Sequence, residues 1–455
     1  MSSNPDNVYL DLVVVNNDNT GGQAKTSLSF TETRNSPFLD NPDNYYLAVA
    51  RFEVDTGGFS LPLFSPVLLL DGSNNDINKT IYTITMTDIT GGKLDDAVTK
   101  YVMWAPEDKS AALPNDVLVN GSLVKQDFST GYYNCYSTEW WINCINKTLL
   151  DCWNTLIALR GMPPPASCAP FFTIDPLTNL VHLFTPTFYT PPASLPITIN
   201  FSTFASKSSG LDNTLPSNIG QTKPPFVGLG AGTPKYSLFF NEPLMNLFSS
   251  LPFIYYGNDS DLNLDMVPGS TALIAYDTNT PYLNYYVQPI NYNGLNTTSV
   301  TDGAGNVIQF VDTVSIYSPV PMWNPVTKLV FTSSFLPVSS GLTSVPNATN
   351  SNDFDFTFSS NQNANVINML TDLEVDLVSG NEYKPQVLYI PESEYRLIDM
   401  FGVNPLSQAS FSVSWRNPYG EIIPFQLGSQ MKASIKFVFR RKRYNLNNLE
   451  PYNIN

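Results

Sequence analysis

The chain has 455 residues with 39 acidic and 23 basic side chains, so its formal net charge is −16. That charge excludes a protein whose whole surface binds nucleic acid or an anionic membrane, since both partners require a positive surface. Charged residues make up only 14% and hydrophobic residues 42%, which excludes a disordered chain, and a length above ~300 residues predicts two or three packed units.

Aromatic and turn-forming residues favour a mainly β architecture. The chain has 28 Phe and 24 Tyr residues, and its 36 Pro and 25 Gly residues are spread along the whole sequence. The apolar run 8–15 predicts a strand, and residues 45–54 predict a central strand because their start is apolar on both faces. Residues 79–87 alternate apolar side chains with threonine, which predicts a half-buried strand.

One long helix is predicted over residues 137–160. Ser137 or Thr138 can cap it, and Gly161 with the three prolines beyond it ends the helix. Apolar residues recur along one side at helical spacing, so we expect this helix to pack on a sheet. A second, shorter helix is predicted to start at 241–243, where proline occupies the first helical position.

Two hairpins are predicted from strand patterns on either side of turn residues. In residues 171–184, Asp175 and Pro176 separate two apolar strands. In residues 410–427, the turn 417–420 follows a strand that alternates strictly between apolar and polar side chains.

No cluster of side chains predicts a metal or cofactor site. The spacings of the four cysteines match no zinc template; they are Cys135, Cys144, Cys152 and Cys168. We therefore expect reduced, buried thiols, and the alternative is a disulfide or ligand role. The single histidine, His182, lies in a predicted strand and is the one candidate for a histidine general base.

Three further motifs depart from the patterns that they resemble. Thr233 replaces the third glycine after the phosphate-loop-like segment 228–232. The acidic segments 71–76 and 259–264 lack the sixth-position glycine and the twelfth-position glutamate of a calcium loop, although weak cation binding stays open. Two pairs of carboxylates are spaced two residues apart, so that both members of a pair would lie on one face of a strand; they are Glu374 with Asp376 and Glu392 with Glu394. Such pairs are typical of solvated surfaces, although a glycosidase also uses a pair of carboxylates.

Neither secretion nor membrane insertion is predicted. Residues 1–11 contain no basic segment followed by an apolar core, so no signal peptide is visible. No apolar run reaches the ~20 residues that a membrane helix requires. We therefore expect a chain that is cytosolic at synthesis and has no membrane span.

The C-terminal end carries the most unusual charge pattern of the chain. Six of the 23 cations lie in residues 432–443 without an acid among them, namely Lys432, Lys436, Arg440, Arg441, Lys442 and Arg443. Residues 433–439 alternate between apolar and polar side chains, which predicts a strand with Lys436 facing outward. Two explanations stay open: an edge strand that its cations protect from aggregation, or a patch that contacts phosphates or an acidic neighbour.

Short segments along the chain match one family pattern in order. They are 41–52 with 61–64, 131–137 leading into the predicted helix, 169–175, 323–325 with 329–333, and 369–374. The strongest match is YIPESEYRLIDM at 389–400, followed by 415–420 and by SIKFVF at 434–439. In this order the chain resembles the penton (minor capsid) proteins of virophages and polinton-like viruses.

The resemblance implies a jelly-roll β-sandwich with an additional β-rich insertion module and one or two covering helices. It also implies a homopentamer without catalytic activity, at the five-fold vertices of an icosahedral shell built mainly from a double jelly-roll major capsid protein. From charge placement, a contact with packaged DNA or the capsid interior is then predicted for Lys436, Arg440, Arg441, Lys442 and Arg443.

Under this resemblance the chain divides into five segments. They are 1–185, the N-terminal part of the jelly roll with helix 137–160; 186–234, a loop-rich insertion; 235–336, a β-rich middle segment; 337–363, a flexible loop; and 364–455, the C-terminal jelly-roll strands and basic tail. Two other functions stay open: a carbohydrate- or receptor-binding β-sandwich, since Tyr, Trp and Asn suit sugars, and an acidic glycoside hydrolase, which needs two facing carboxylates.

Overall fold

A computed structural model describes most of the chain. The described residues are 6–18, 25–56, 61–70, 75–88, 97–160, 168–189, 236–251, 284–287, 296–301, 305–338, 341–343, 365–375, 378–379, 382–383, 386–390, 396–418 and 421–442.

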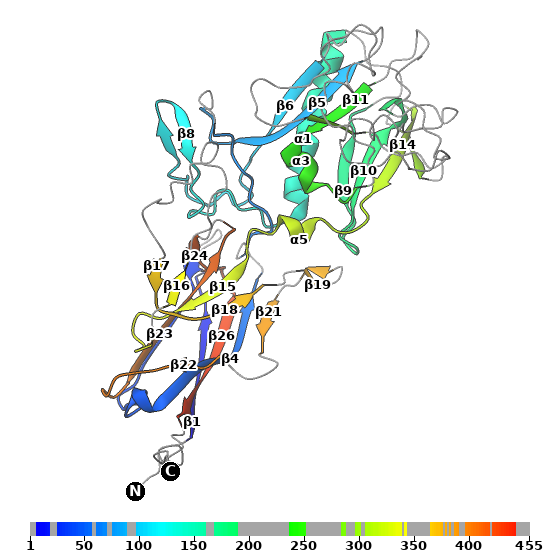
Figure 1. The fold of residues 1–455 in the computed structure, drawn as a ribbon. Coiled ribbons are helices and arrows are strands. Elements are labelled where there is room, and N and C mark those ends of the chain that lie inside the picture. The colour runs from blue at the N-terminus through cyan, green and yellow to red at the C-terminus, as the bar shows by residue number, and fades with distance from the viewer. Residues whose placement is uncertain are drawn as a thin grey trace, which may run out of the picture.

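The chain folds into two units stacked end to end (Figure 1). Two separate clusters of buried side chains form their cores, one from the beginning and end of the chain and one from its middle. The lower unit contains strands before residue 56 and after residue 327, and the upper unit contains the elements between them. The upper unit is therefore an insertion between two strands of the lower unit.

The lower unit is a jelly roll made of two antiparallel sheets. In spatial order the first sheet contains β1 (Asn7–Val15), β26 (Lys432–Arg441), β4 (Tyr45–Asp55) and β21 (Gln386–Tyr389), with β22 (Ile398–Asp399) also beside β4. The second contains β3 (Ser29–Thr33), β23 (Gln408–Arg416), β15 (Lys328–Thr332) and β18 (Met369–Glu374), with β24 (Ile422–Pro424) also beside β23. Counting these eight main strands along the chain gives the orders 1-8-3-6 and 2-7-4-5, which is jelly-roll connectivity.

Short elements connect these strands. They are the turn η1 (Pro42–Asn44) and the pairs β2 (Thr26–Ser27) with β25 (Gln426–Leu427), β16 (Gly341–Thr343) with β17 (Asn365–Ile367), and β19 (Val378–Ser379) with β20 (Glu382–Tyr383).

The basic strand β26 lies inside the first sheet. It pairs with β1 on one side through nine residues and with β4 on the other, with one bulge between Lys436 and Phe437. Of the two explanations left open for these cations, the protected edge strand is therefore wrong. The extra residue of the bulge is Ala50 on β4, and the register of β26 with β1 is continuous. Phe437 and Phe439 therefore lie in the core, and Val438 is buried on the opposite face of the sheet.

Aromatic side chains join the two sheets of the jelly roll. The rings of Phe411 on β23 and Phe437 on β26 stack with centroids 3.7 Å apart, and neither side chain is exposed. The rings of Phe52 on β4 and Phe331 on β15 meet edge to face at 4.9 Å. Such pairs add to the apolar area that holds facing sheets together.

The upper unit contains two more four-stranded sheets around a long helix. The first sheet has the order β12 (Asn284–Val287), β11 (Tyr236–Asn241), β5 (Lys79–Asp88), β6 (Ala97–Met103), and the second β13 (Thr297–Thr301), β14 (Val307–Val314), β10 (Val181–Pro186), β9 (Phe171–Ile174). Helix α1 (Thr138–Arg160) packs on β5, β6 and β9. The smaller elements are the hairpin β7 (Val117–Val119) with β8 (Ser122–Lys125), α3 (Glu242–Leu247), α5 (Val320–Trp323) and η2 (Thr187–Tyr189).

A capping side chain and one half-buried amide fix helix α1. Ser137 Oγ accepts a hydrogen bond from the backbone N–H of Trp140 at 3.3 Å, as an N-cap side chain does. Asn146 donates to the carbonyl of Phe172 at 2.8 Å and accepts from its N–H at 2.7 Å, which ties the helix to β9. Trp141 is fully buried in the core of the upper unit.

The local predictions agree with the structure in most places. Both helices, both hairpins, the strand at 8–15 and the central position of 45–54 are confirmed. The prediction that 79–87 is half-buried is wrong, because side chains 81–86 are all buried. Threonine tolerates this burial where its hydroxyl is paired, as between Thr85 and Thr99 at 2.8 Å.

Helix α1 lies in the upper unit and not in the jelly roll with which it was grouped in segment 1–185. Its apolar side is complementary to β5, β6 and β9, which belong to the inserted unit. The remaining segment boundaries stay a prediction, and residues 190–235 and 344–364 lie outside the described part of the chain.

Replacing Phe437 by Ala is expected to lower the free energy of unfolding by about 3–5 kcal/mol, because it removes a fully buried ring and leaves a cavity between the sheets. Urea denaturation followed by tryptophan fluorescence measures the change. Leu177→Ala, at a side chain that is 77% exposed, is the control and should cost almost nothing. Equal losses in the two variants would contradict the packing described here.

Candidate assembly surfaces

Two of the five predicted basic contact residues are engaged within the chain. The Nζ atom of Lys436 lies 5.1 Å from the centre of the Tyr9 ring, on the outer face of the sheet. The Nζ atom of Lys442 lies 3.1 Å from Asp399 Oδ1 and donates to the carbonyl of Met400 at 3.0 Å. Only 12% of the Lys442 side chain is exposed, so its charge is largely compensated inside the jelly roll.

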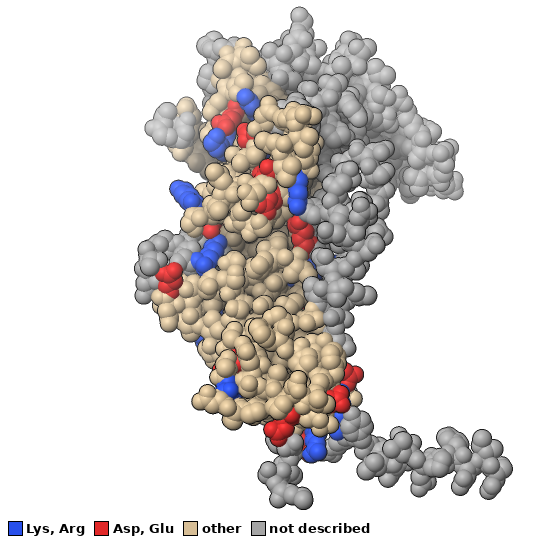
Figure 2. All heavy atoms as spheres, turned by 90° about the vertical axis from the view of Figure 1, so that its left-hand side faces the viewer, with Lys and Arg blue, Asp and Glu red and all other residues tan. Residues whose placement is uncertain are grey.

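The next two basic residues reach the surface. Arg440 and Arg441 are exposed at the end of β26, where the backbone N–H of Arg441 donates to the carbonyl of Asp6 at 2.8 Å. Arg443 lies outside the described residues. Acidic side chains lie beside basic ones at this lower end (Figure 2). The described residues therefore contain an exposed arginine pair and not one patch of five cations.

One flank of the molecule is poor in charge. Figure 2 shows isolated Lys, Arg, Asp and Glu side chains in the upper unit and at the lower end, with a broad uncharged area over the jelly roll between them. Uncharged areas of this kind are typical of surfaces that pack against another protein.

Three elements each carry two or more exposed apolar side chains. On the outer face of β1 they are Tyr9, Val13 and Val15. On β21 and the residue after it they are Leu388 and Ile390. On the β7–β8 hairpin they are Val117, Leu118, Val119 and Val124. These sets are candidate contact surfaces.

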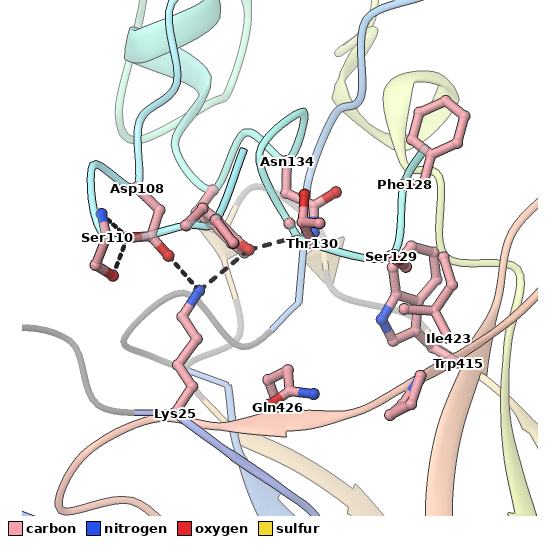
Figure 3. A pocket seen from close by; sticks show the side chains of 15 residues that line it. Lys25, Asp108, Ser110, Phe128, Ser129, Thr130, Asn134, Trp415, Ile423 and Gln426 are labelled. Carbon is pink, nitrogen blue, oxygen red and sulfur yellow. Dashed lines mark hydrogen bonds and ion pairs between the residues drawn. The ribbon is translucent and has the colours of Figure 1, made fainter. Parts of the chain in front are cut away.

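A cavity of about 360 Å³ lies between the jelly roll and the upper unit, and residues of both line it (Figure 3). The jelly roll contributes Trp415, Ile423 and Gln426 to its wall, and Lys25 lies near the start of β2. The upper unit contributes polar side chains, among them Asp108, Ser110, Ser129, Thr130, Asn134 and Tyr136. The cavity therefore marks the junction of the two units.

An ion pair crosses this junction. Lys25 Nζ donates to Asp108 Oδ2 at 2.6 Å, and it lies 3.3 Å from the hydroxyl oxygen of Tyr136 (Figure 3). Burial disfavours the carboxylate of Asp108, but hydrogen bonds from Lys25 and Ser110 and the charge of Lys25 outweigh it and lower the pKa of Asp108 below its ordinary value. Asp108 therefore stays ionised and orients the upper unit on the jelly roll.

The remaining sequence candidates form no catalytic arrangement in the described residues. His182 Nδ1 lies 3.0 Å from Asp312 Oδ1 on the adjacent strand. The cysteines are free, three are buried, and burial raises the pKa of Cys144 to about 11, which makes its thiol unreactive. Among the described residues, no group of three His, Cys, Asp or Glu side chains could hold a metal ion.

Several sequence candidates lie outside the described residues. They are residues 71–74 of the first acidic segment, segments 228–232 and 259–264, Asp376, Glu392 and Glu394. In the described parts of the chain, no helix has the length and apolar character to cross a membrane.

The sequence analysis did not find the ion pair at the junction. Lys25 and Asp108 are 83 residues apart, and neither stands in a motif. The sequence contained a weak signal for the exposed apolar residues of β1. The run 8–15 is apolar on both faces, whereas one face of a strand in a sandwich usually meets water and is polar.

The comparisons with known proteins agree with the fold. The family model of the Sputnik minor capsid protein V18/19 matches residues 8–441. The uncharacterized protein V18 of Sputnik virophage is 26% identical over 168 residues, which is 37% of this chain and 92% of that protein.

Two solved structures are also similar. A chain in the 3.5 Å cryo-electron microscopy structure of the Sputnik virophage has a TM-score of 0.67 and 21% identity, with 97% of this chain and 100% of that chain covered. The mavirus penton protein has a TM-score of 0.50 and 15% identity, with 96% and 100% covered. At these identities the two structures support the fold.

Replacing Lys25 by Met is expected to lower the free energy of unfolding by about 3–5 kcal/mol at neutral pH, because the buried carboxylate of Asp108 loses its cation. In the wild type, Asp108 has a lowered pKa, so its contribution is present above its unfolded pKa and is lost as the pH falls through the folded value. The difference between variant and wild type should therefore shrink in acid.

Urea denaturation at neutral pH and near pH 3 measures this difference. Lys147→Met is the matched control, because Lys147 and Asp151 are paired at 3.1 Å but are 75% and 51% exposed, and such pairs contribute about 0.3–0.5 kcal/mol. A Lys25→Met loss no greater than that of the control would show that the junction does not depend on the ion pair.

Proposed function

The chain belongs to the Sputnik minor capsid protein V18/19 family, and from this premise we propose that it is the penton of an icosahedral virion. As a member of that family it is a structural component of the capsid. In the proposed role, five copies form a ring that closes each five-fold vertex. The matches give no support to the carbohydrate- or receptor-binding alternative, and the absence of catalysis stays a prediction.

The observation that carries the proposal is that the chain ends and the inserted unit lie at opposite ends of the jelly roll. The eight-stranded jelly roll holds the first and last strands together, and the inserted unit lies at its other end (Figure 1). A ring of upright jelly rolls would then direct all five inserted units to one side of the shell and all chain ends to the other. The uncharged flank of the jelly roll suits the lateral contacts of such a ring.

The partners follow from this position. The ring would contact copies of itself laterally and the double jelly-roll major capsid protein around its rim, where many weak contacts add. The lower end, with the exposed Arg440 and Arg441, would face the packaged DNA. Synthesis in the host cytoplasm belongs to the same proposal.

The purified chain is expected to form a pentamer of about 252 kDa, five times the 50.4 kDa of one chain. Size-exclusion chromatography with light scattering measures the mass over a range of protein concentrations. A chain that stays monomeric throughout, or that forms dimers or trimers, would contradict the proposed function.

Replacing Arg440 and Arg441 by Gln is expected to weaken DNA binding by the pentamer and to reduce the slope of log affinity against log salt by about 1.8 for each protomer whose arginine pair contacts the DNA, since each phosphate contact contributes about 0.9. Fluorescence anisotropy with duplex DNA at several salt concentrations measures the slope. Lys147→Gln, at an exposed cation of the upper unit, is the control. An unchanged slope in the arginine variant would remove DNA from the partners.

A further inference from the structure

In the described part of the chain, the first sheet of the jelly roll has two edges that no further strand covers. Its order is β1, β26, β4, β21, so β1 and β21 lie at opposite sides, and each pairs with one strand only among the described residues. Unpaired strand edges accept a further strand unless the chain protects them with charges, proline or a bulge.

The β1 edge has little of this protection. β1 is nine residues long and contains neither lysine nor proline, and its register with β26 is continuous. Its one acidic residue, Asp11, is paired with Arg51 at 3.4 Å. On its outer face Tyr9 is 58% exposed and Val13 is 64% exposed. Such a strand in a stable soluble assembly is expected to be covered by another chain.

The opposite edge is also apolar on the same face of the sheet. Leu388 on β21 is 56% exposed and Ile390 just beyond it is 58% exposed. Leu388 is opposite Glu53 of β4, whose side chain is turned away from the core between the buried Phe52 and Val54. The two edges therefore present similar surfaces on opposite sides of one chain, as a head-to-tail contact requires.

Strand direction selects which edges can meet. All neighbouring strands in the sheet are antiparallel, so β1 and β4 run one way and β26 and β21 the other. Placing β21 of one copy beside β1 of the next therefore continues the antiparallel alternation from copy to copy. Pairing β1 with β1 would instead create a two-fold contact and could not propagate around a ring.

The register puts matching residues at one level. Val13 is opposite Ser434, Ser434 is opposite Glu53, and Glu53 is opposite Leu388. These four residues form one row across the sheet, perpendicular to the strands. If the ring axis runs along the strands, rotation about it carries each copy into the next and leaves the height of this row along the axis unchanged. Leu388 of one copy then lies at the same height as Val13 of its neighbour.

We propose that the β21 edge of each protomer lies against the β1 edge of the next, so that Leu388 and Val13 meet and the first sheet continues around the ring. This inference rests on the proposed function, since it assigns the lateral contact of the pentamer. Each of the two edges is then covered by another copy of the same chain.

Cysteine cross-linking tests the contact. In a Cys168→Ser background, which leaves only the buried native thiols, Val13→Cys and Leu388→Cys are combined in one chain. Cross-strand neighbours on one face have Cβ atoms about 4.5–5.5 Å apart, within reach of a short bis-maleimide. We expect a denaturing-gel ladder that extends to the pentamer, and no ladder from either single variant.

Val13→Cys combined with Leu177→Cys is the matched control, since Leu177 is more exposed than Leu388 but lies in the upper unit. A ladder in the control, or cross-linked dimers from Val13→Cys alone, would overturn the inference. A pentamer by light scattering without a ladder would also overturn it while leaving the proposed function intact. A wild-type chain that forms no pentamer would overturn both.

Discussion

The pairing of β26, the last described strand, with β1, the first, holds the jelly roll together. β26 lies between β1 and β4, so two of the four ladders described in that sheet need residues 432–441. β1 and β26 lie at opposite ends of the sequence, so bringing them together costs chain entropy before the apolar faces of the sheets can meet. The same ladder holds both ends of the described chain together and leaves the connection between β4 and β15 to carry the inserted unit.

The insertion then needs a fixed orientation, and polar chemistry provides it. Apolar contact between the two units is non-directional, whereas the Lys25–Asp108 pair at 2.6 Å and the neighbouring Tyr136 hydroxyl specify one arrangement. A buried ion pair adds little net stability relative to apolar packing, but losing one partner is costly, so it penalises other orientations. In a ring, this would give every inserted unit the same position relative to the axis.

The elements that sequence analysis located correctly are those determined by neighbouring residues. The cap at Ser137, the turn at Asp175 and the alternation before Trp415 each act over a few residues, and each gave an element of the expected type. The expectations that were wrong concerned neighbours in space. The cations of β26 resemble edge protection in the sequence, yet β1 pairs on the side where solvent was expected. Thr85 resembles a solvent-facing residue, yet it meets Thr99.

The mainly β character, the long helix, the hairpins and, through ordered short segments, the resemblance to a capsid family could all be read from the amino-acid sequence. The three-dimensional fold was needed to show that β26 is central, that α1 belongs to the inserted unit, that Lys442 is paired with Asp399, and that β1 and β21 are the opposite edges of the first sheet as described. Periodicity reports which side of an element is apolar. It cannot report which distant strand covers that side, because that partner is selected by the packing of the whole chain.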